Sequence, residues 1–245
     1  MYKIVSDEFT APNGEKKRFW YREGTNDRDT IQAAFVEDEY GILGLDFKDG
    51  DIVIDIGAHI GAVTLLFTTL RPDLRIFSFE PMPKNFDLLK SNVIDNETEN
   101  EISISKMAVW FYDEDKVSLF YGDNSPSGKT HKNIGSMFMI HDFYHPSLFK
   151  NVETISLSKI FEENHIRDCR FMKIDCEGME YGIFKGTPKE VLAMIERIHG
   201  EYHNIDTVKI KKPRKTLLDQ TKGVFKDETG HPEKGNIGPF IFIRK

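Results

Sequence analysis

The distribution of apolar and polar positions along the chain predicts buried strands that alternate with helices. Residues 52–56 contain four apolar residues and one acid, which is typical of a strand buried on both faces of a sheet. Residues 60–70 have the spacing of an apolar helix face, and Arg71-Pro72 ends that helix. The same reasoning predicts strands at 75–80, 102–109, 170–175 and 197–203, and helices at 84–95, 158–164, 188–196 and 214–222.

This alternation predicts an α/β fold with a Rossmann-like, doubly wound, mostly parallel seven-stranded sheet. Two apolar stretches near the C-terminus, 223–226 and 239–244, predict an antiparallel hairpin at one sheet edge. We divide the chain into an N-terminal part that caps the core, residues 1–50, and a sheet-forming domain, residues 51–245. Within the N-terminal part we predict short strands at 2–5 and 19–21 and a helix at 30–40.

Residues 110–157 interrupt the alternation of strands and helices. We predict a hairpin in which 110–112 pairs with 117–121, followed by an irregular insertion at 122–150. Its side chains could form part of an acceptor pocket or a lid, and a surface excursion packed by aromatic rings is an equal alternative. The residues concerned are Phe138, His141, Phe143, Tyr144 and His145.

Composition narrows the class of protein. The chain has 245 residues and a formal net charge of −7, which argues against a dedicated nucleic-acid binder because such proteins present a basic surface. Its two cysteines, Cys169 and Cys176, are too few for a disulfide framework, and we expect both to be reduced. The N-terminus lacks the features of a signal peptide and no apolar run reaches the length of a membrane span, so we expect a cytoplasmic protein.

The strongest site signal is the loop after the first buried strand, Asp55-Ile56-Gly57-Ala58-His59-Ile60-Gly61. A strand followed by a glycine loop and a helix places a ligand at the carboxyl edge of a sheet. A dinucleotide loop needs glycine where this chain has His59, and Asp55 would repel a pyrophosphate. The same carboxylate would attract the ammonium and sulfonium groups of S-adenosylmethionine (SAM). We therefore predict SAM binding by Asp55, Gly57, Ala58, His59 and Gly61; the alternative is a turn that needs glycine for its backbone alone.

Two further segments complete the predicted cofactor site. Glu80, followed by Pro81, ends the second strand of the sheet, where a carboxylate can accept hydrogen bonds from both ribose hydroxyls of a nucleoside. Met107 and Ala108 lie near the end of the third predicted strand, where backbone groups could meet the adenine edge. This second assignment rests on position only.

Acids and a histidine lie at the carboxyl ends of the fourth and fifth predicted strands. Asp175 ends the fourth strand and Glu177 and Glu180 follow it, and strand alternation puts Glu201 and His203 on one side of the fifth. A carboxylate beside an imidazole makes an acid–base pair, and with Asp175 the same groups could bind a divalent metal. We predict catalytic roles for Asp175, Glu177, Glu201 and His203. The alternatives are acids that stabilise a helix N-terminus and a histidine whose hydrogen bonds are satisfied at a strand end.

These segments resemble the FkbM-type methyltransferases. The matching stretches are 53–61, 79–81, 172–180 and 184–186, of which the third is the most distinctive, and the resemblance covers about residues 25–205. It implies a class I methyltransferase fold, SAM as the methyl donor, and O-methylation of a hydroxyl on a sugar or secondary metabolite. Asp55, Gly57 and Gly61 match the SAM loop of the family, Glu80 matches its ribose-binding acid, and Asp175 and Glu177 match its acidic motif.

Three other functions stay open at this point. The chain could be an NAD-dependent oxidoreductase, a methyltransferase acting on RNA or protein, or a non-catalytic domain that kept the fold. The basic segment 209–215 favours the second, although such a run is usually a solvated face. We expect a small-molecule acceptor, no nucleic-acid partner and no membrane span, with a homodimer as one further expectation.

Overall fold

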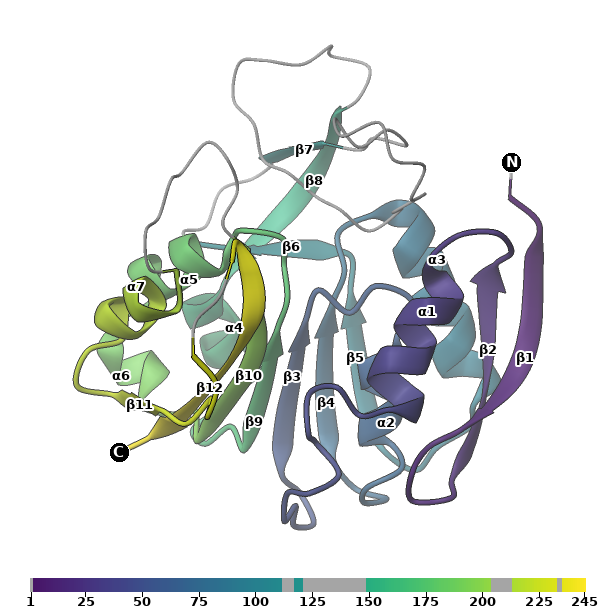
Figure 1. Cartoon of the computed structure of the whole chain (residues 1–245), viewed down its shortest axis with the longest axis horizontal. Helices are drawn as coiled ribbons and strands as arrows, with labels where there is room; N and C mark the ends of the chain where they lie inside the picture. The colour runs from purple at the N-terminus through teal and green to yellow at the C-terminus, as the bar shows by residue number, and fades with distance from the viewer. Residues whose placement is uncertain (1, 112–116, 121–148, 204–212, 233–234) are drawn as a thin grey trace.

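The computed structural model describes residues 2–111, 117–120, 149–203, 213–232 and 235–245. Its centre is a seven-stranded sheet with the order β11-β12-β10-β9-β3-β4-β5 (Figure 1). The strands are β3 (Ile52–Ile56), β4 (Arg75–Phe79), β5 (Glu101–Ser105), β9 (Phe171–Ile174), β10 (Arg197–His203), β11 (Phe225–Asp227) and β12 (Ile237–Arg244). The mostly parallel seven-stranded sheet is therefore confirmed, as is the antiparallel pair β11–β12 at one edge.

Helices cover both faces of this sheet, because consecutive residues of each buried strand contribute to opposite cores. Ile54 and Ile56 belong to one hydrophobic cluster, whereas Val53 belongs to the other. The helices of this part are α2 (Ala62–Phe67), α3 (Pro83–Asp95), α4 (Leu157–Glu163), α5 (Glu180–Gly186), α6 (Lys189–Leu192) and α7 (Pro213–Gln220). Helix α5 was not predicted from the sequence, and α6 is shorter than the predicted helix at 188–196.

The strand order reverses at β3. Strands β4 and β5 follow one another on one side of β3, whereas β9 and then β10 lie on the other side, all parallel to it. Their carboxyl ends point toward the same edge, which is uppermost in Figure 1. Ligands of doubly wound sheets bind where the strand order reverses. This topology therefore predicts a ligand site at the segments that follow β3 and β9.

The N-terminal part packs directly against the sheet. Strands β1 (Ile4–Thr10) and β2 (Lys16–Arg22) form an antiparallel hairpin, and helix α1 (Asp27–Ile31) continues into the π-helical turn η1 (Gln32–Val36). The predicted helix at 30–40 is therefore wrong in its bounds, since the helix starts earlier and ends at Val36. Phe19 and Phe35 share a hydrophobic cluster with Leu66 of α2. The division at residue 50 stays a prediction, with one core common to both sides.

The structure corrects the interpretation of residues 102–157. The predicted third strand is two strands, β5 and β6 (Met107–Trp110), separated by Lys106. Strand β6 pairs in parallel with β8 (Phe149–Ser156), and β7 (Val117–Phe120) pairs antiparallel with β8. The predicted hairpin of 110–112 with 117–121 is therefore wrong, because both segments find their partner in β8. Most of the predicted insertion, and all five of its candidate pocket residues, lie outside the described residues.

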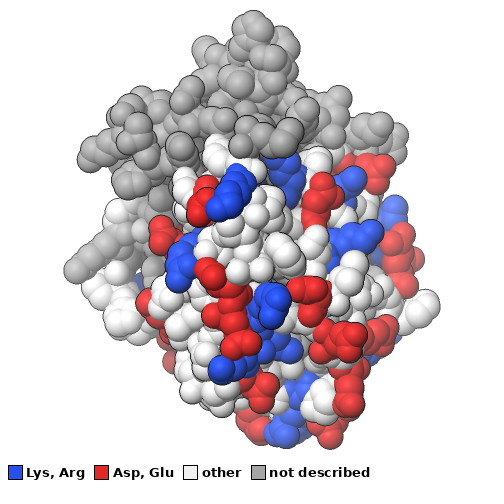
Figure 2. Space-filling view, turned by 90° about the vertical axis from the view of Figure 1, so that its right-hand side faces the viewer, with Lys and Arg blue, Asp and Glu red and all other residues white. Residues whose placement is uncertain are grey.

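The surface charge, the two cysteines and the length of the helices bear on the expectations from composition. On the face formed by the right-hand side of Figure 1, acidic and basic side chains are interspersed without a continuous basic area (Figure 2). Both cysteines are buried free thiols, as predicted. Among the described residues, no helix combines the length and the apolar character needed to cross a membrane.

Candidate functional site

The glycine loop after β3 passes closely over the end of β9. Gly57 has a φ of 78°, and a Cβ atom placed on it would lie 1.9 Å from the carbonyl oxygen of Asp175. Gly61 has a φ of 93°, and its Cβ would lie 2.7 Å from Cδ1 of Leu89 in α3. Glycine at these positions lets the backbone approach its neighbours and adopt the left-handed conformation. The loop thereby joins the ends of β3 and β9 at the point where the strand order reverses.

Glu80 follows β4 and is held by the same loop. Its Oε2 accepts a hydrogen bond from the backbone N–H of His59 at 2.8 Å, and its Oε1 accepts one from Met82 at 2.8 Å. Burial raises the pKa of Glu80 to about 7. The Asn85 amide also donates to Oε1, at 3.5 Å, whereas Oε2 keeps a second lone pair with which Glu80 can accept a hydrogen bond from a ligand hydroxyl.

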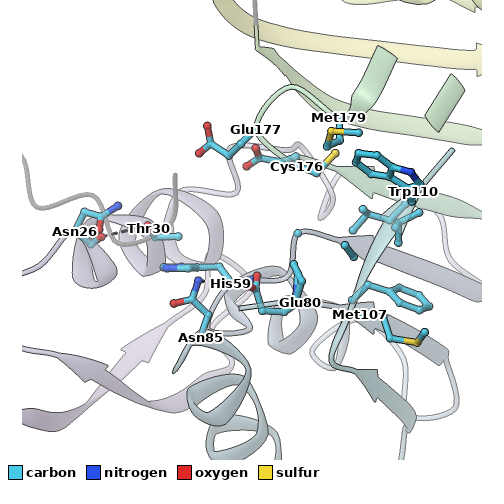
Figure 3. Close-up of a pocket in the computed structure, with 17 residues that line it drawn as sticks. Asn26, Thr30, His59, Glu80, Asn85, Met107, Trp110, Cys176, Glu177 and Met179 are labelled. Atoms are coloured by element: carbon cyan, nitrogen blue, oxygen red, sulfur yellow. Dashed lines mark hydrogen bonds between the residues drawn. The ribbon is translucent and has the colours of Figure 1, made fainter. Parts of the chain in front are cut away.

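These groups line a cavity at the carboxyl edge of the sheet. Figure 3 draws Glu80 and His59 on one side of it, with Trp110 and Met179 across from them. Of the residues predicted from sequence, the cavity is lined by Gly57, His59, Glu80, Pro81, Met107, Ala108, Asp175 and Glu177. Sequence reasoning missed Asn26, Thr30, Asn85, Trp110 and Met179, which also line it. No local signal marks them, because they come from helices α1 and α3 and from the ends of strands and loops.

The cavity has the features that a SAM site requires. Glu80 offers a carboxylate for ribose hydroxyls, and Met107, Ala108 and Trp110 offer an apolar wall on which an adenine ring could pack. The position of Gly57 leaves no room for a side chain, so the backbone itself lines the cavity. These residues therefore fit SAM.

The structure corrects the prediction at Asp55. This carboxylate does not line the cavity but is fully buried beneath α2. Its Oδ2 accepts a hydrogen bond from the Thr64 hydroxyl at 2.8 Å, and its Oδ1 lies 3.4 Å from Nζ of Lys173. The cause is strand alternation, which turns Asp55 to the face that carries Val53 and α2. An internal ammonium, not the cofactor, balances the Asp55 charge.

Lys173 in β9 was missed by the sequence analysis. Its Nζ donates to the carbonyl oxygens of Gly57, at 2.6 Å, and of Ile56, at 3.3 Å, and so supports the glycine loop from below. Burial would lower the pKa of Lys173, but the charges of Asp55 and Asp175 outweigh burial and raise it. A single lysine within the apolar strand Phe171–Ile174 was the signal for such a buried ion pair.

His59 is fixed by the N-terminal part. The Arg22 guanidinium, which also pairs with the buried Asp27, donates toward His59 Nε2 at 3.3 Å. Burial lowers the pKa of His59 to about 4, so the ring is neutral. An acceptor at Nε2 puts the proton on Nδ1, which is buried and has no hydrogen-bond partner in the described part of the chain. His59 thus has one buried N–H group that no described residue accepts.

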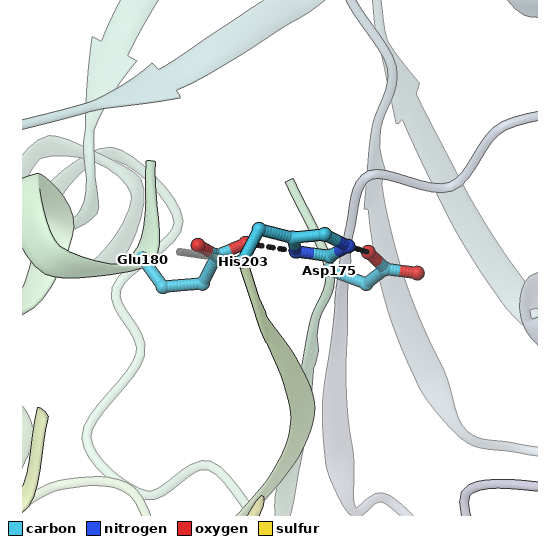
Figure 4. A group of neighbouring side chains, drawn as sticks. All are labelled: Asp175, Glu180 and His203. Carbon is cyan, nitrogen blue, oxygen red and sulfur yellow. Dashed lines mark hydrogen bonds and ion pairs between the residues drawn. The ribbon is translucent and has the colours of Figure 1, made fainter. Parts of the chain in front are cut away.

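Carboxylates surround the imidazole of His203 at the end of β10. Figure 4 shows the ring between Glu180 and Asp175, whose carboxylate oxygens lie 3.4 Å from Nδ1 and 3.8 Å from Nε2. The Nε2 atom also lies 3.2 Å from Glu201 and 3.5 Å from Glu177. The structure thus brings together the four residues predicted to be catalytic.

Charge decides what His203 can do in this cluster. Burial alone would lower its pKa, but hydrogen bonds to Glu180 and Glu201 raise it to about 11. His203 is therefore an imidazolium at neutral pH, and in this state it cannot accept a proton. Burial raises the pKa of Glu177 to about 7, which leaves that carboxyl group better matched to proton transfer near neutral pH.

Glu180 has a structural role in the same cluster. It is fully buried, and its Oε1 accepts hydrogen bonds from the backbone N–H groups of Cys176, at 3.0 Å, and Gly178, at 3.3 Å. Asp175, Glu180 and His203 each offer an atom within 4.8 Å of the others, and their donor types suit a divalent cation. In this structure the imidazolium is the cation that the carboxylates surround.

Comparison with known proteins agrees with this geometry. The chain matches the methyltransferase FkbM domain over residues 55–215. It is 24% identical over 212 residues to the 31-O-demethyl-FK506 methyltransferase FkbM of Streptomyces tacrolimicus, covering 79% of this chain and 77% of that protein. It is 25% identical over 203 residues to the hexuronic acid methyltransferase AglP of Haloferax volcanii, covering 76% and 72%.

Among solved structures, precorrin-6y C5,15-methyltransferase from Geobacter metallireducens aligns with a TM-score of 0.45 and 16% identity, covering 86% of this chain and 90% of that one. The domain match includes Glu80, Asp175, Glu177, Glu201 and His203. The chain therefore belongs to the FkbM methyltransferase family and is a SAM-dependent methyltransferase.

Proposed function

We propose that this enzyme transfers the methyl group of SAM to a hydroxyl oxygen of a sugar or secondary metabolite. The observation that carries the proposal is the position of Asp175 and Glu177, two carboxylates on the wall of the cavity that fits SAM. A hydroxyl is a weak nucleophile until its proton leaves, so carboxylates beside the donor suit an oxygen acceptor. The two relatives named above also take small molecules, a demethylated FK506 and a hexuronic acid.

The cofactor-binding roles remain proposals of the same kind. Glu80 would accept hydrogen bonds from the ribose hydroxyls, and the loop backbone from Gly57 to Gly61 would follow the cofactor. Pro81, Met107 and Ala108 would pack against its nucleoside part. When bound, SAM supplies an electrophilic methyl group on a positively charged sulfur. Asp55 and Lys173 would not contact the cofactor but would position the glycine loop that does.

For proton transfer we assign the base to Glu177. It lines the SAM cavity, it lies 3.5 Å from the His203 imidazolium, and its pKa of about 7 suits it to accept a proton near neutral pH. Asp175 and Glu201 would orient the acceptor through hydrogen bonds. His203 would position the carboxylates, since its charge holds them around one point.

The test uses SAM with a ¹³C-labelled methyl group and a panel of hydroxylated sugars and metabolites. Carbon NMR of the product identifies the atom that receives the methyl group, and we expect a methoxy signal that Glu177→Gln strongly reduces. Parallel reactions with EDTA, and with Mg²⁺ added back, test whether a divalent cation takes part. Label on nitrogen, carbon, RNA or protein would contradict the proposal.

The family assignment bears on the alternative functions that the sequence left open. Membership of a methyltransferase family is incompatible with an NAD-dependent oxidoreductase. Methylation of RNA or protein stays a prediction that the same experiment addresses, since most of segment 209–215 lies outside the described residues. Cytoplasmic location and homodimer formation likewise stay predictions.

A further inference from the structure

A second cleft opens beside the SAM cavity and shares Asn26, Thr30 and Asp175 with it. Its remaining wall comes from two distant parts of the chain. The N-terminal part contributes residues of α1, η1 and the loop that follows, and the β10–β12 strand pair contributes Gly200, Glu201 and Pro239. The cleft therefore lies on the side of Asp175 away from the proposed nucleoside site. An acceptor lying there would reach the carboxylates assigned to proton transfer.

The charged residues that line this cleft are all acids. Asp29, Glu39, Asp175 and Glu201 contribute to the wall, and its described residues include no lysine, arginine or histidine. Asp29 and Glu39 are exposed residues that face any entering molecule. Partial burial of the Glu39 carboxyl group and the charge of Asp175 raise the pKa of Glu39 to about 7, so its full negative charge is present at a pH above that value. These four carboxylates come from four separate segments, namely α1, the loop after η1, the loop after β9, and β10, so the charge is a property of the cleft and not of one acidic run.

The nearest cations, Lys173 and His203, lie behind the wall of the cleft and offset part of the charge of Asp175 and Glu201. Lys173 Nζ lies 4.0 Å from Asp175 but donates to Gly57 and pairs with Asp55 behind the cleft. His203 is balanced by Glu180 on one side and Glu201 on the other. Neither cation lines the cleft, so a ligand that enters it meets the carboxylates first.

Hydrogen bonding in the cleft favours the same kind of ligand. The Tyr40 hydroxyl donates to Asp175 Oδ2 at 2.8 Å, which uses its only proton and orients the carboxylate. The carboxylates of Asp29, Glu39 and Glu201 are acceptors only when ionised. Acceptors thus predominate among the polar side chains of the wall, which suits a ligand that supplies donors, as hydroxyl and ammonium groups do.

We propose that this cleft is the acceptor subsite and that it selects an uncharged or positively charged polyhydroxylated molecule, such as a neutral or amino sugar, over one that carries a carboxylate. The inference rests on the proposed function and adds to it the charge class of the acceptor. It also assigns specificity to Asp29 and Glu39, which precede the matched methyltransferase domain. One added carboxylate about 6 Å from such an acid in a half-solvated cleft corresponds to roughly tenfold weaker binding.

The experiment compares three probes that share one sugar ring, namely methyl glucoside, methyl glucosaminide and methyl glucuronide. Each is titrated at low salt and pH 8.5, where Glu39 is ionised, against the 245-residue chain saturated with S-adenosylhomocysteine, and ligand-observed NMR gives the dissociation constants. We expect the glucuronide to bind about tenfold more weakly than the glucoside, and the glucosaminide at least as tightly as the glucoside. The difference should shrink in high salt because the charges are solvent-accessible.

Matched variants connect the preference to the cleft. Asp29→Asn/Glu39→Gln should bring the glucuronide close to the glucoside. Asp73→Asn/Glu97→Gln removes the same charge from exposed positions at the opposite edge of the sheet and should leave the order of the probes unchanged. The inference is overturned if the glucuronide binds as tightly as the others, if no probe binds, or if both double variants act alike. Calorimetry with S-adenosylhomocysteine is run first, and a lack of binding there would contradict the proposed function instead.

Discussion

The ammonium group of Lys173 lies 3.4 Å from the carboxylate of Asp55, and both side chains are at most 4% exposed. This buried pair joins β9 to β3 directly beneath the glycine loop, because the same ammonium donates to the Gly57 carbonyl oxygen at 2.6 Å. The acid that precedes the loop therefore acts on the cofactor site through the loop backbone. A charge that sequence alone would direct at the ligand is balanced within the protein.

Breaking this pair from one side should cost more than replacing it. Lys173→Met leaves Asp55 buried without its cation, and we expect a loss of about 3–5 kcal/mol in the free energy of unfolding. In Asp55→Asn/Lys173→Met no buried charge is left unpaired, so the double variant should be more stable than Lys173→Met. Urea denaturation checks this, and a double variant no more stable than Lys173→Met would contradict it.

Gly57 and Gly50 allow a matched test of the loop, because both have a φ of 78°. A Cβ atom at Gly50 meets nothing within 4 Å, whereas one at Gly57 would lie 1.9 Å from the Asp175 carbonyl oxygen. Gly50→Ala should therefore cost only the backbone strain, about 1 kcal/mol, and keep SAM affinity. Gly57→Ala should push the loop away from β9 and weaken SAM binding by at least tenfold in calorimetry. Equal affinities for the two variants would show that this close approach is not needed.

The sequence predicts the central sheet well because its strands are marked locally. The segments of β3, β4 and β9 are short, mostly apolar and bounded by turn residues, which is typical of strands buried on both faces. The pairing of β6 with β8 could not be predicted in this way. Residues 107–110 find their partner more than 40 positions later, and no local pattern specifies such a partner.

In the site, too, some residues are marked by local sequence patterns and others are brought there only by long-range packing. Glycine and acid residues placed after strands locate the cavity edge, since carboxyl ends of parallel strands meet there. The direction of the Asp55 side chain follows from strand alternation and from Lys173, which a motif-based interpretation of the loop leaves out. Asn26, Thr30 and Tyr40 reach the site from helices and loops whose sequences carry no site signal, and only packing of the N-terminal part brings them there.

SAM affinity should rise with pH through about 7. Burial raises the pKa of Glu80 to about 7, so below that pH the group binds a proton in the free enzyme. Ribose hydroxyls donate best to the ionised carboxylate, so binding must first remove that proton. Glu80→Gln should weaken SAM binding and flatten this pH dependence, as measured by calorimetry from pH 5.5 to 8.5. An unchanged slope in the variant would assign the titration to another group.

Turnover should depend on Glu177 in a way that separates base catalysis from binding. With its pKa at about 7, the rate at saturating SAM should increase from pH 6 to pH 8 as Glu177 loses its proton. Glu177→Gln should lower kcat by roughly 100-fold or more while SAM affinity changes little. The comparison needs an acceptor from the panel described above. A variant with full kcat and an unchanged pH profile would move the base to another carboxylate.

The His203 cluster predicts that the free enzyme loses stability as pH rises above neutrality. Its folded pKa of about 11 exceeds the ordinary value of 6.5, so the folded state binds this proton more tightly than the unfolded state. The resulting stabilisation is fully present below pH 6.5 and is lost as pH rises toward 11. At lower pH two other pairs of residues affect the stability in opposite directions. Burial lowers the pKa of His59 and His199 to about 4, so these residues make the stability rise with pH, whereas Glu80 and Glu177, with pKa values raised to about 7, make it fall.

The informative range is therefore pH 7–8, because above it the buried thiols of Cys169 and Cys176, whose pKa values burial raises, also lower the stability as pH rises. Urea unfolding should give a free energy that falls across this range in the natural chain and is flatter in His203→Gln. His231→Gln changes an exposed histidine and should retain the natural slope. If His203→Gln kept that slope as well, the imidazole would carry no proton in the folded protein. The four carboxylates around it would then need another cation to balance them.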